Sequence, residues 1–437
     1  MKYKILIITS LVFLTSCASN KTFRPSSDSV CPYTKKGECN VNAIQLANSN
    51  TQRKYHLSFI EYDDQGQLRS PKQKNNVIKH YKKLAEDKDI LLITFVHGWH
   101  HSAKVNDPNI ESFRELLEQS AELELKKGGS GREVLGLYIG WRGSSLDIKV
   151  PFTKTKVPLL KYGEILTFWD RKNTAQEIGQ IGVSSTLLEL ESLIKANKTA
   201  NNKMITIGHS FGAAVVFSSL QSIFAERFIE GRPFGETTVA NGFGDLVVLL
   251  NPAFEALRFG PLYDLSQESC LEYPDEQLPK LVILTSECDL ATRWAFPAGR
   301  VFSTIFETHN NITRNFCTSK HVGVHLTKEA YVDIIAVGHA KPYMTHMLKK
   351  EAGAKSELHN KHVNTLPDTW SKSSNLGIAK FKGVVLESLD RTKPRNPYLN
   401  VQVSKNIIGN HNDIWRDEIK YFIRDLISLS SSSKKKN

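Results

Sequence analysis

The feature that most constrains this chain is a Gly-His-Ser-Phe-Gly motif at residues 208–212, which separates two segments of different periodicity. Met204, Ile205 and Ile207 make a short apolar run rich in β-formers that predicts a strand, whereas residues 213–228 carry apolar side chains at helical spacing. Strand, sharp turn and helix are the context in which G-x-S-x-G presents a strained serine. We therefore predict that Ser210 is a nucleophile. The alternative is a glycine-rich turn whose serine only caps the helix.

The amino terminus has the pattern of an exported protein. Lys2 and Lys4 precede the apolar run 5–14, and Leu14-Thr15-Ser16-Cys17 follows it. A basic segment, a short apolar segment and small residues before a cleavage point are typical of a secretory signal. The cysteine after them resembles the lipobox of bacterial lipoproteins, which implies that the signal peptide 1–16 is removed and Cys17 is lipidated. An ordinary signal peptide that contains a cysteine is the alternative.

Localisation follows from the same resemblance. Ala18, rather than an aspartate, comes after the lipobox cysteine, which favours the outer membrane of a bacterial envelope. Residues 17–50 are rich in Ser, Asn, Lys and Thr and predict a flexible tether from lipidated Cys17 to the folded body. The Ser/Lys tail 430–437 predicts a disordered end.

The cysteines bear on redox state and metal binding. Five of the six cysteines remain when the lipobox cysteine is set aside, and export places them where disulfides form. Cys31 and Cys39 lie close in sequence and are the favoured pair, while the odd count leaves at least one thiol over. No C-x-x-C repeat appears, which argues against a zinc ribbon, and we expect no metal.

The formal net charge of +12 is not accompanied by any nucleic-acid-binding motif. We therefore expect no nucleic-acid partner. The excess of basic residues suits a surface beside anionic lipid head groups. A solvated basic surface without a partner is the alternative.

Apolar, strand-like segments alternate with helical ones along most of the chain, which predicts an α/β fold with a mostly parallel, doubly wound sheet. Such a sheet carries its functional residues at the carboxyl ends of the strands. We place one domain at residues 51–429, with an insertion or lid at 290–398 before the last strand. The predicted strands are 54–61, 90–96, 133–140, 203–207, 246–250, 281–285 and 398–403.

A serine hydroxyl needs a histidine to take its proton, and the imidazole needs a carboxylate to fix its tautomer. The chain order Ser, acid, His narrows the choice among 14 histidines. We favour Asp289, just after strand 281–285, as the acid, with Glu287 and Glu255 as alternatives.

For the histidine we favour His411, which lies in G-N-H-N-D-I-W between the last strand and the closing amphipathic helix. His339 and His346 are the alternatives. His209, on the serine turn itself, is expected to point away from Ser210 and to pack.

The strand at 90–96 ends in His97-Gly98-Trp99-His100-His101. A strand that closes in H-G well before G-x-S-x-G resembles the oxyanion loop of the α/β-hydrolase fold. The resemblance implies that the backbone N–H groups of Trp99 and Phe211 form an oxyanion hole. The histidines also allow a metal cluster as an alternative, but no carboxylate stands at a fixed spacing from them.

Taken together, the lipobox, H-G-W, G-H-S-F-G, S-E-C-D and H-N-D-I-W resemble serine hydrolases of the α/β-hydrolase superfamily of the bacterial lipoprotein type. The resemblance covers roughly residues 55–429, interrupted by the insertion. It implies an esterase or lipase acting on acyl-ester or lipid substrates without a metal or organic cofactor. Alternatives are a thioesterase, amidase or peptidase on the same fold, or a catalytically inactive scaffold that acts as an envelope binding lipoprotein.

Overall fold

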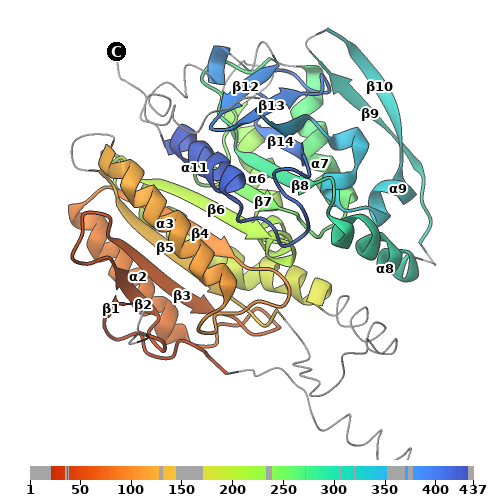
Figure 1. Ribbon diagram of the computed structural model, residues 1–437. Helices are drawn as coiled ribbons and strands as arrows, with labels where there is room; N and C mark the ends of the chain where they lie inside the picture. The colour runs from red at the N-terminus through yellow and green to blue at the C-terminus, as the bar shows by residue number, and fades with distance from the viewer. Residues whose placement is uncertain are drawn as a thin grey trace, which may run out of the picture.

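The computed structural model describes residues 21–431 apart from 35–36, 38, 127–130, 144–170, 233–238, 271, 305–306, 319, 352–369 and 373–376. Within these residues a 12-stranded sheet forms the centre of the protein, in the order β1-β2-β3-β5-β4-β6-β7-β8-β14-β11-β13-β12, and β9 and β10 form a separate ribbon (Figure 1). The strands are β1 (Cys31–Tyr33), β2 (Ile44–Ala47), β3 (Tyr55–Glu61), β4 (Ile90–Val96), β5 (Glu133–Gly140), β6 (Lys203–His209), β7 (Leu246–Leu250), β8 (Leu281–Ser286), β9 (Asn311–Cys317), β10 (Val322–Lys328), β11 (His346–Lys350), β12 (Ile378–Phe381), β13 (Val384–Ser388) and β14 (Tyr398–Val403).

Every neighbouring pair from β3 across the sheet to β11 is parallel. Antiparallel pairing is confined to the flanks, where β2 joins β3 and β13 joins β11 and β12. The predicted α/β class with a mostly parallel sheet is therefore confirmed. All seven residues of β4 are buried, as expected for an apolar strand covered on both faces.

Helices cover both faces of the sheet. Helices α2, α5, α6 and α7 pack their apolar side chains against one face, and α3 and α11 cover the other (Figure 1). The helices are α2 (Pro71–Asp87), α3 (Pro108–Lys126), α5 (Ser184–Lys195), α6 (Phe211–Gly231), α7 (Ala256–Gln267), α8 (Phe296–Ser303), α9 (Glu329–Ile334) and α11 (Asp417–Ser431), with π-helical turns η1 (Gly179–Val183) and η4 (Ala291–Ala295) and 3-10 turns η3 (Glu268–Cys270), η5 (Val337–His339) and η6 (Lys341–Tyr343). None of the described helices combines the length and the apolar composition needed to span a bilayer.

The segment predicted as a flexible tether, residues 17–50, differs from that expectation. The N–H groups of Phe23 and Arg24 each donate to the carboxylate of Glu61 at 2.8 Å, and β1 and β2 extend the sheet beyond β3. Strands pair through backbone hydrogen bonds, which form without an apolar pattern of side chains. The polar composition of this segment therefore gave no sign of β1 and β2. The predicted signal peptide 1–16 and Cys17 lie outside the described residues.

A disulfide joins Cys31 to Cys39, the predicted pair. A second disulfide, which the sequence analysis did not assign, joins Cys270 to Cys317 and ties β9 to η3. Cys288 is the free cysteine among those in the described residues.

Residues 290–398, predicted as an insertion or lid, contribute three strands to the sheet, together with the separate β9–β10 ribbon and the helices α8 and α9. Strands β11, β13 and β12 continue it beyond β14, which is therefore an interior strand. Parts of this region, 352–369 and 373–376, lie outside the described residues. So does most of the predicted disordered tail, although its first two residues complete α11.

Candidate active site

Ser210 lies at the junction of β6 and α6, at the carboxyl edge of the sheet. Its backbone has φ 55° and ψ −120°, a conformation that non-glycine residues rarely adopt. The turn is fixed from outside, because the Ser210 N–H donates to the carbonyl of Leu250 at 2.9 Å and its own carbonyl accepts from Ala253. Strain held in place by surrounding bonds is typical of functional turns.

The glycines of this turn leave room for close backbone contacts. A Cβ at Gly212 would lie 2.1 Å from the carbonyl oxygen of Val96, and one at Gly98 would lie 2.8 Å from Cβ of Ser210. Both contacts are shorter than real Cβ atoms tolerate. The H-G-W segment and the serine turn can therefore pack together only because these positions are glycine.

Ser210, His411 and Asp289 form a continuous chain of hydrogen bonds. His411 Nε2 lies 2.7 Å from Ser210 Oγ, and His411 Nδ1 lies 2.8 Å from Asp289 Oδ2. An ionised carboxylate only accepts hydrogen bonds, so Nδ1 carries the hydrogen and Nε2 accepts from the serine hydroxyl. The three residues come from positions 210, 289 and 411 and meet where β6 and β8 end and where the loop after β14 crosses them.

Asp289 is fully buried and held ionised by its partners. Burial alone would raise the pKa of its carboxyl, but the charge of His411 and hydrogen bonds from His411 and Thr292 lower it below the ordinary value. Thr292 donates to Asp289 through both its N–H and its hydroxyl. The same hydroxyl oxygen lies 2.9 Å from Nε2 of His339, so His339 supports the acid rather than the serine.

Two side chains hold the backbone of His411, and the sequence analysis did not assign this role to either. His209 Nε2 lies 3.0 Å from the His411 carbonyl oxygen, and Asn251 Nδ2 donates to the same oxygen at 2.8 Å. Asn251 also accepts from the N–H of Ser286 at the end of β8. The imidazole loop is thereby tied to the strands that carry the serine and the acid. His209, which was expected from the sequence to pack, instead bonds to the His411 backbone.

This geometry predicts that His209 is a positioning residue. Replacing it with phenylalanine removes the donor while filling the space, and should lower kcat about tenfold with little change in KM, because a displaced imidazole is poorly aligned. Replacing it with glutamine keeps an amide donor and should recover most of the rate. Steady-state kinetics on the two variants measure this. Equal loss in both would contradict the positioning role.

The H-G-W segment is anchored beside Ser210 by His97. His97 Nε2 accepts from the backbone N–H of Trp141 at 3.1 Å, and the His97 carbonyl accepts from the Trp141 indole at 2.9 Å. Phe211 begins α6, where backbone N–H groups point out of the helix and favour negative charge. The rings of Trp99 and Phe211 lie edge to face, 6.4 Å apart, so the two segments proposed for an oxyanion hole are in contact.

The residues considered as alternatives to Asp289 and His411 make contacts with other groups. Glu255 is buried beside Lys172 and Arg300. The side chain of Glu287 accepts the N–H of Lys405 at 2.9 Å, and His346 on β11 contacts Thr345.

Metal binding by the H-G-W histidines finds no support in their contacts. His97 is buried against the Trp141 ring, whereas the His101 imidazole pairs with Asp107 at 2.9 Å. Elsewhere in the described residues, Glu307, His309 and Asp333 bring their ligand atoms within 4.8 Å of one another. The guanidinium of Arg300 lies 2.8 Å from Asp333 and supplies positive charge to that group.

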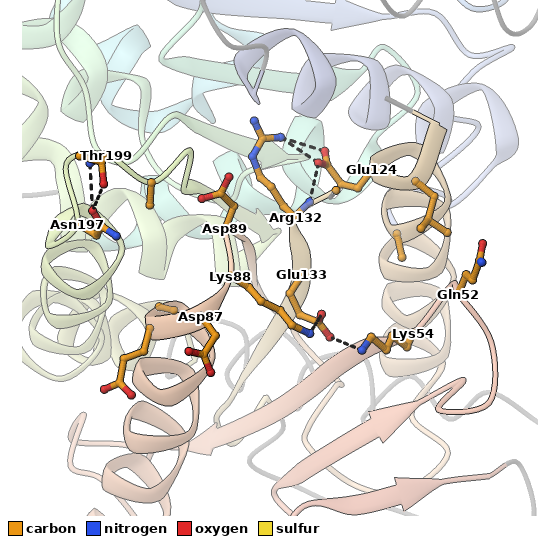
Figure 2. A pocket seen from close by; sticks show the side chains of 16 residues that line it. Gln52, Lys54, Asp87, Lys88, Asp89, Glu124, Arg132, Glu133, Asn197 and Thr199 are labelled. Atoms are coloured by element: carbon orange, nitrogen blue, oxygen red, sulfur yellow. Dashed lines mark hydrogen bonds and ion pairs between the residues drawn. The ribbon is translucent and has the colours of Figure 1, made fainter. Parts of the chain in front are cut away.

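Two cavities lie on opposite edges of the sheet. One of about 600 Å³ lies at the amino ends of β4 and β5, and several of its charges are paired, with Lys88 and Lys54 on Glu133 and Arg132 on Glu124 (Figure 2). Another of about 390 Å³ opens at the carboxyl edge and is lined by residues 100–108, which follow the H-G-W segment. The second cavity is thus on the same edge as Ser210.

Comparisons with known proteins place few limits on the chain. No family model matches it, and no curated protein matches it. Matching solved structures include phospholipase PlaB from Legionella pneumophila in complex with thio-NAD, at 16% identity over 55% of this chain and 49% of that chain with a TM-score of 0.22. An uncharacterized protein from Pseudomonas aeruginosa matches at 12% identity over 49% of this chain and 38% of that chain, with a TM-score of 0.17. The chain therefore spans half or less of the length of either structure.

Proposed function

We propose that the protein is a serine hydrolase that cleaves carboxylic esters and is anchored to the bacterial envelope. The observation that carries this proposal is the chain of hydrogen bonds from Ser210 Oγ through His411 to buried Asp289. Nucleophile, base and orienting acid within hydrogen-bond reach define the site of an acyl-transfer enzyme by geometry rather than by fold. The strained turn at Ser210 and the parallel sheet beneath it fit the nucleophile elbow of an α/β-hydrolase.

In the proposed reaction Ser210 Oγ attacks the acyl carbon while His411 Nε2 takes the hydroxyl proton. The tetrahedral intermediate collapses by breaking the bond to the ester oxygen, and Nε2 returns the proton to the leaving alcohol. Water then gives a proton to Nε2 as its oxygen attacks the acyl carbon. The second tetrahedral intermediate collapses by breaking the bond to Ser210 Oγ, Nε2 returns the proton to Oγ, and the carboxylic acid leaves. Asp289 accepts from Nδ1–H throughout and stabilises the imidazolium.

Negative charge develops on the former carbonyl oxygen in both steps. We assign its stabilisation to the backbone N–H groups of Trp99 and Phe211, with the amino terminus of α6 adding a favourable field. One donor of this kind contributes about 3 kcal/mol to the transition state. The proposed chemistry needs no metal or organic cofactor.

A fluorophosphonate probe tests the proposal directly, because it phosphonylates a serine only when a base activates the hydroxyl. We expect the wild-type protein to be labelled on the peptide that contains Ser210, and His411→Ala to react far more slowly. Labelling that persists in Ser210→Ala would refute the mechanism. A wild-type protein that remains unlabelled would favour the inactive envelope scaffold.

The nature of the acyl group is part of the same proposal. A lipid anchor at Cys17 would hold the enzyme beside acyl esters of the bilayer, which favours a lipid or acyl-ester substrate over a peptide. Hydrolysis of esters of increasing acyl length separates a lipase from a short-chain esterase. Matched thioesters and amides separate both from a thioesterase, an amidase or a peptidase.

Replacing Cys17 with alanine should move the protein from the membrane fraction to the soluble fraction. Each CH₂ of an acyl chain contributes about 0.8 kcal/mol to membrane binding, so loss of the chains removes the main attachment. Fractionation after a high-salt wash, which screens surface charge, measures the change. Sucrose-gradient separation of the two membranes tests the outer-membrane assignment for the wild type. Unchanged fractionation of the variant would contradict lipidation.

A further inference from the structure

An exposed apolar stripe follows directly after the buried acid of the site. It consists of Leu290, directly before η4, Trp294 on η4, and Ala298 and Val301 on α8, and the leucine, tryptophan and valine are 65%, 66% and 46% exposed. Steps of four, four and three residues place these side chains along one side of a helix. A contiguous apolar surface of this kind on a protein in water marks an interaction site.

The stripe begins at the same edge of the sheet as Ser210. Strands β6, β7 and β8 are parallel neighbours, so Ser210 and Leu290, which follow β6 and β8, emerge from the same side. Two strand spacings separate the strands, or about 10 Å. Figure 1 shows α8 beyond the end of β8, at the outer margin of the molecule.

The amino-terminal segment enters the body at this edge as well. Phe23 and Arg24 are bound to Glu61 at the carboxyl end of β3, and Arg24 Nε also donates to the carbonyl of Ala103 at 2.9 Å. β3, β5, β4 and β6 are successive parallel neighbours, which puts this attachment three strand spacings from Ser210, or about 15 Å. The serine therefore lies between the amino-terminal attachment and the apolar stripe.

The attachment leaves little chain between the body and a lipid anchor. Six residue steps separate Cys17 from Phe23, and a fully extended chain spans about 20 Å over that length. A tether free to residue 50 would have reached about 110 Å. A lipid on Cys17 therefore holds the carboxyl edge of the sheet close to the bilayer.

We propose that this edge docks on the lipid bilayer, with the stripe at the head-group boundary and with buried Ser210 on the side of the sheet that faces the membrane. The orientation rests on the proposed lipidation of Cys17, whereas the stripe itself does not. Tryptophan suits the boundary between head groups and acyl chains. The exposed basic residues Lys104 and Lys405 on loops and Arg293 on η4 lie at the same edge and suit anionic lipids.

Ile229 offers a matched control. It is 57% exposed and lies near the end of α6, which leaves Ser210 and runs for 21 residues toward the opposite edge of the sheet, about 30 Å away. A side chain there stays in water if the carboxyl edge faces the bilayer.

Hydroxyl-radical footprinting of the lipidated protein in vesicles of phosphatidylethanolamine and phosphatidylglycerol tests the proposal. The oxidation of Trp294 relative to Ile229 should fall about fivefold against the mature chain without lipid or vesicles, because the indole leaves water. An unchanged ratio would overturn the proposal. Protection of Trp294 without vesicles, together with a doubled mass in solution, would assign the stripe to a second copy of the chain and would also overturn it.

Vesicle flotation of the mature chain without lipid tests the stripe alone. The double variant Leu290→Ser/Trp294→Ser should lower the bound fraction about tenfold, whereas Ile229→Ser should not change it. Equal binding of the two variants, or no binding of the unsubstituted chain, would count against docking. Neither readout uses catalysis. If the chain binds vesicles but the fluorophosphonate probe does not label it, only the proposed hydrolase activity is refuted. If the probe labels Ser210 but the chain does not bind vesicles, only the proposed membrane-docking surface is refuted.

Discussion

Replacing Ser210 with alanine should lower kcat for ester hydrolysis by about 10⁴- to 10⁶-fold, because serine, imidazole and carboxylate act as one unit. In the proposed mechanism, the Ser210 Oγ atom that lies 2.7 Å from His411 Nε2 becomes bonded to the acyl group, and no neighbouring group replaces it. The residual rate would come from binding and from the oxyanion donors alone. Single-turnover kinetics on a soluble chromogenic ester measure the change without the complication of product release.

Ser219→Ala is a suitable control for this result. Ser219 is also a buried serine of the β6–α6 unit, but its hydroxyl donates to the carbonyls of Gly179 and Val215, away from the imidazole. It should keep nearly full activity. Thermal unfolding of both variants should remain cooperative, since a single lost hydrogen bond changes stability by about 1 kcal/mol. If the Ser210→Ala variant hydrolyses the ester at the wild-type rate, Ser210 is not the nucleophile.

The central strands and the chain order of the site could be predicted from the sequence. β4 and β5 are continuous apolar runs, and their predicted bounds match the structure. Ser210, Asp289 and His411 each follow a strand, and parallel strands bring their carboxyl ends to one edge. The structure brings the three side chains together because of this topology, not because of any local signal between them.

The outer strands of the sheet and the side chains that hold the His411 backbone could not be predicted in the same way. β1 and β11 are short, and their side chains do not show the apolar period that identifies a strand. The contacts of His209 and Asn251 with the His411 carbonyl cross 202 and 160 residues and join side chains to backbone. Every residue has a backbone carbonyl, so no sequence pattern shows which side chain will donate a hydrogen bond to a particular one.

The second large effect expected is loss of stability in mild acid. Burial lowers the pKa of His209 to about 3, and it lowers the pKa of four further histidines to about 4, namely His80, His97, His339 and His346. Nδ1 of His209 is buried without a hydrogen-bond partner among the described residues, so a proton there would be buried and unpaired. In the unfolded chain the same imidazoles take up protons near pH 6.5, at about their ordinary pKa.

The direction of the change in stability with pH follows from whether the folded or the unfolded chain binds the protons. Above about pH 6.5 both states leave these five imidazoles neutral, and the full stability is present. As the pH falls toward the folded pKa values, only the unfolded chain gains the protons, so the free energy of unfolding drops by about 7 kcal/mol per pH unit for five groups. Typical domains have only about 5–15 kcal/mol in total, so we expect unfolding by about pH 4.5.

Urea unfolding followed by circular dichroism at several pH values between neutrality and mild acid measures the slope. The variant His209→Gln removes one of the five titrating groups while keeping an amide donor for the His411 carbonyl, and should reduce the slope by about one fifth. Because Asp289 has a lowered pKa and titrates only in stronger acid, its contribution is separate from this range. A free energy of unfolding that stays constant through mild acid would show that the buried imidazoles are not held neutral by the fold.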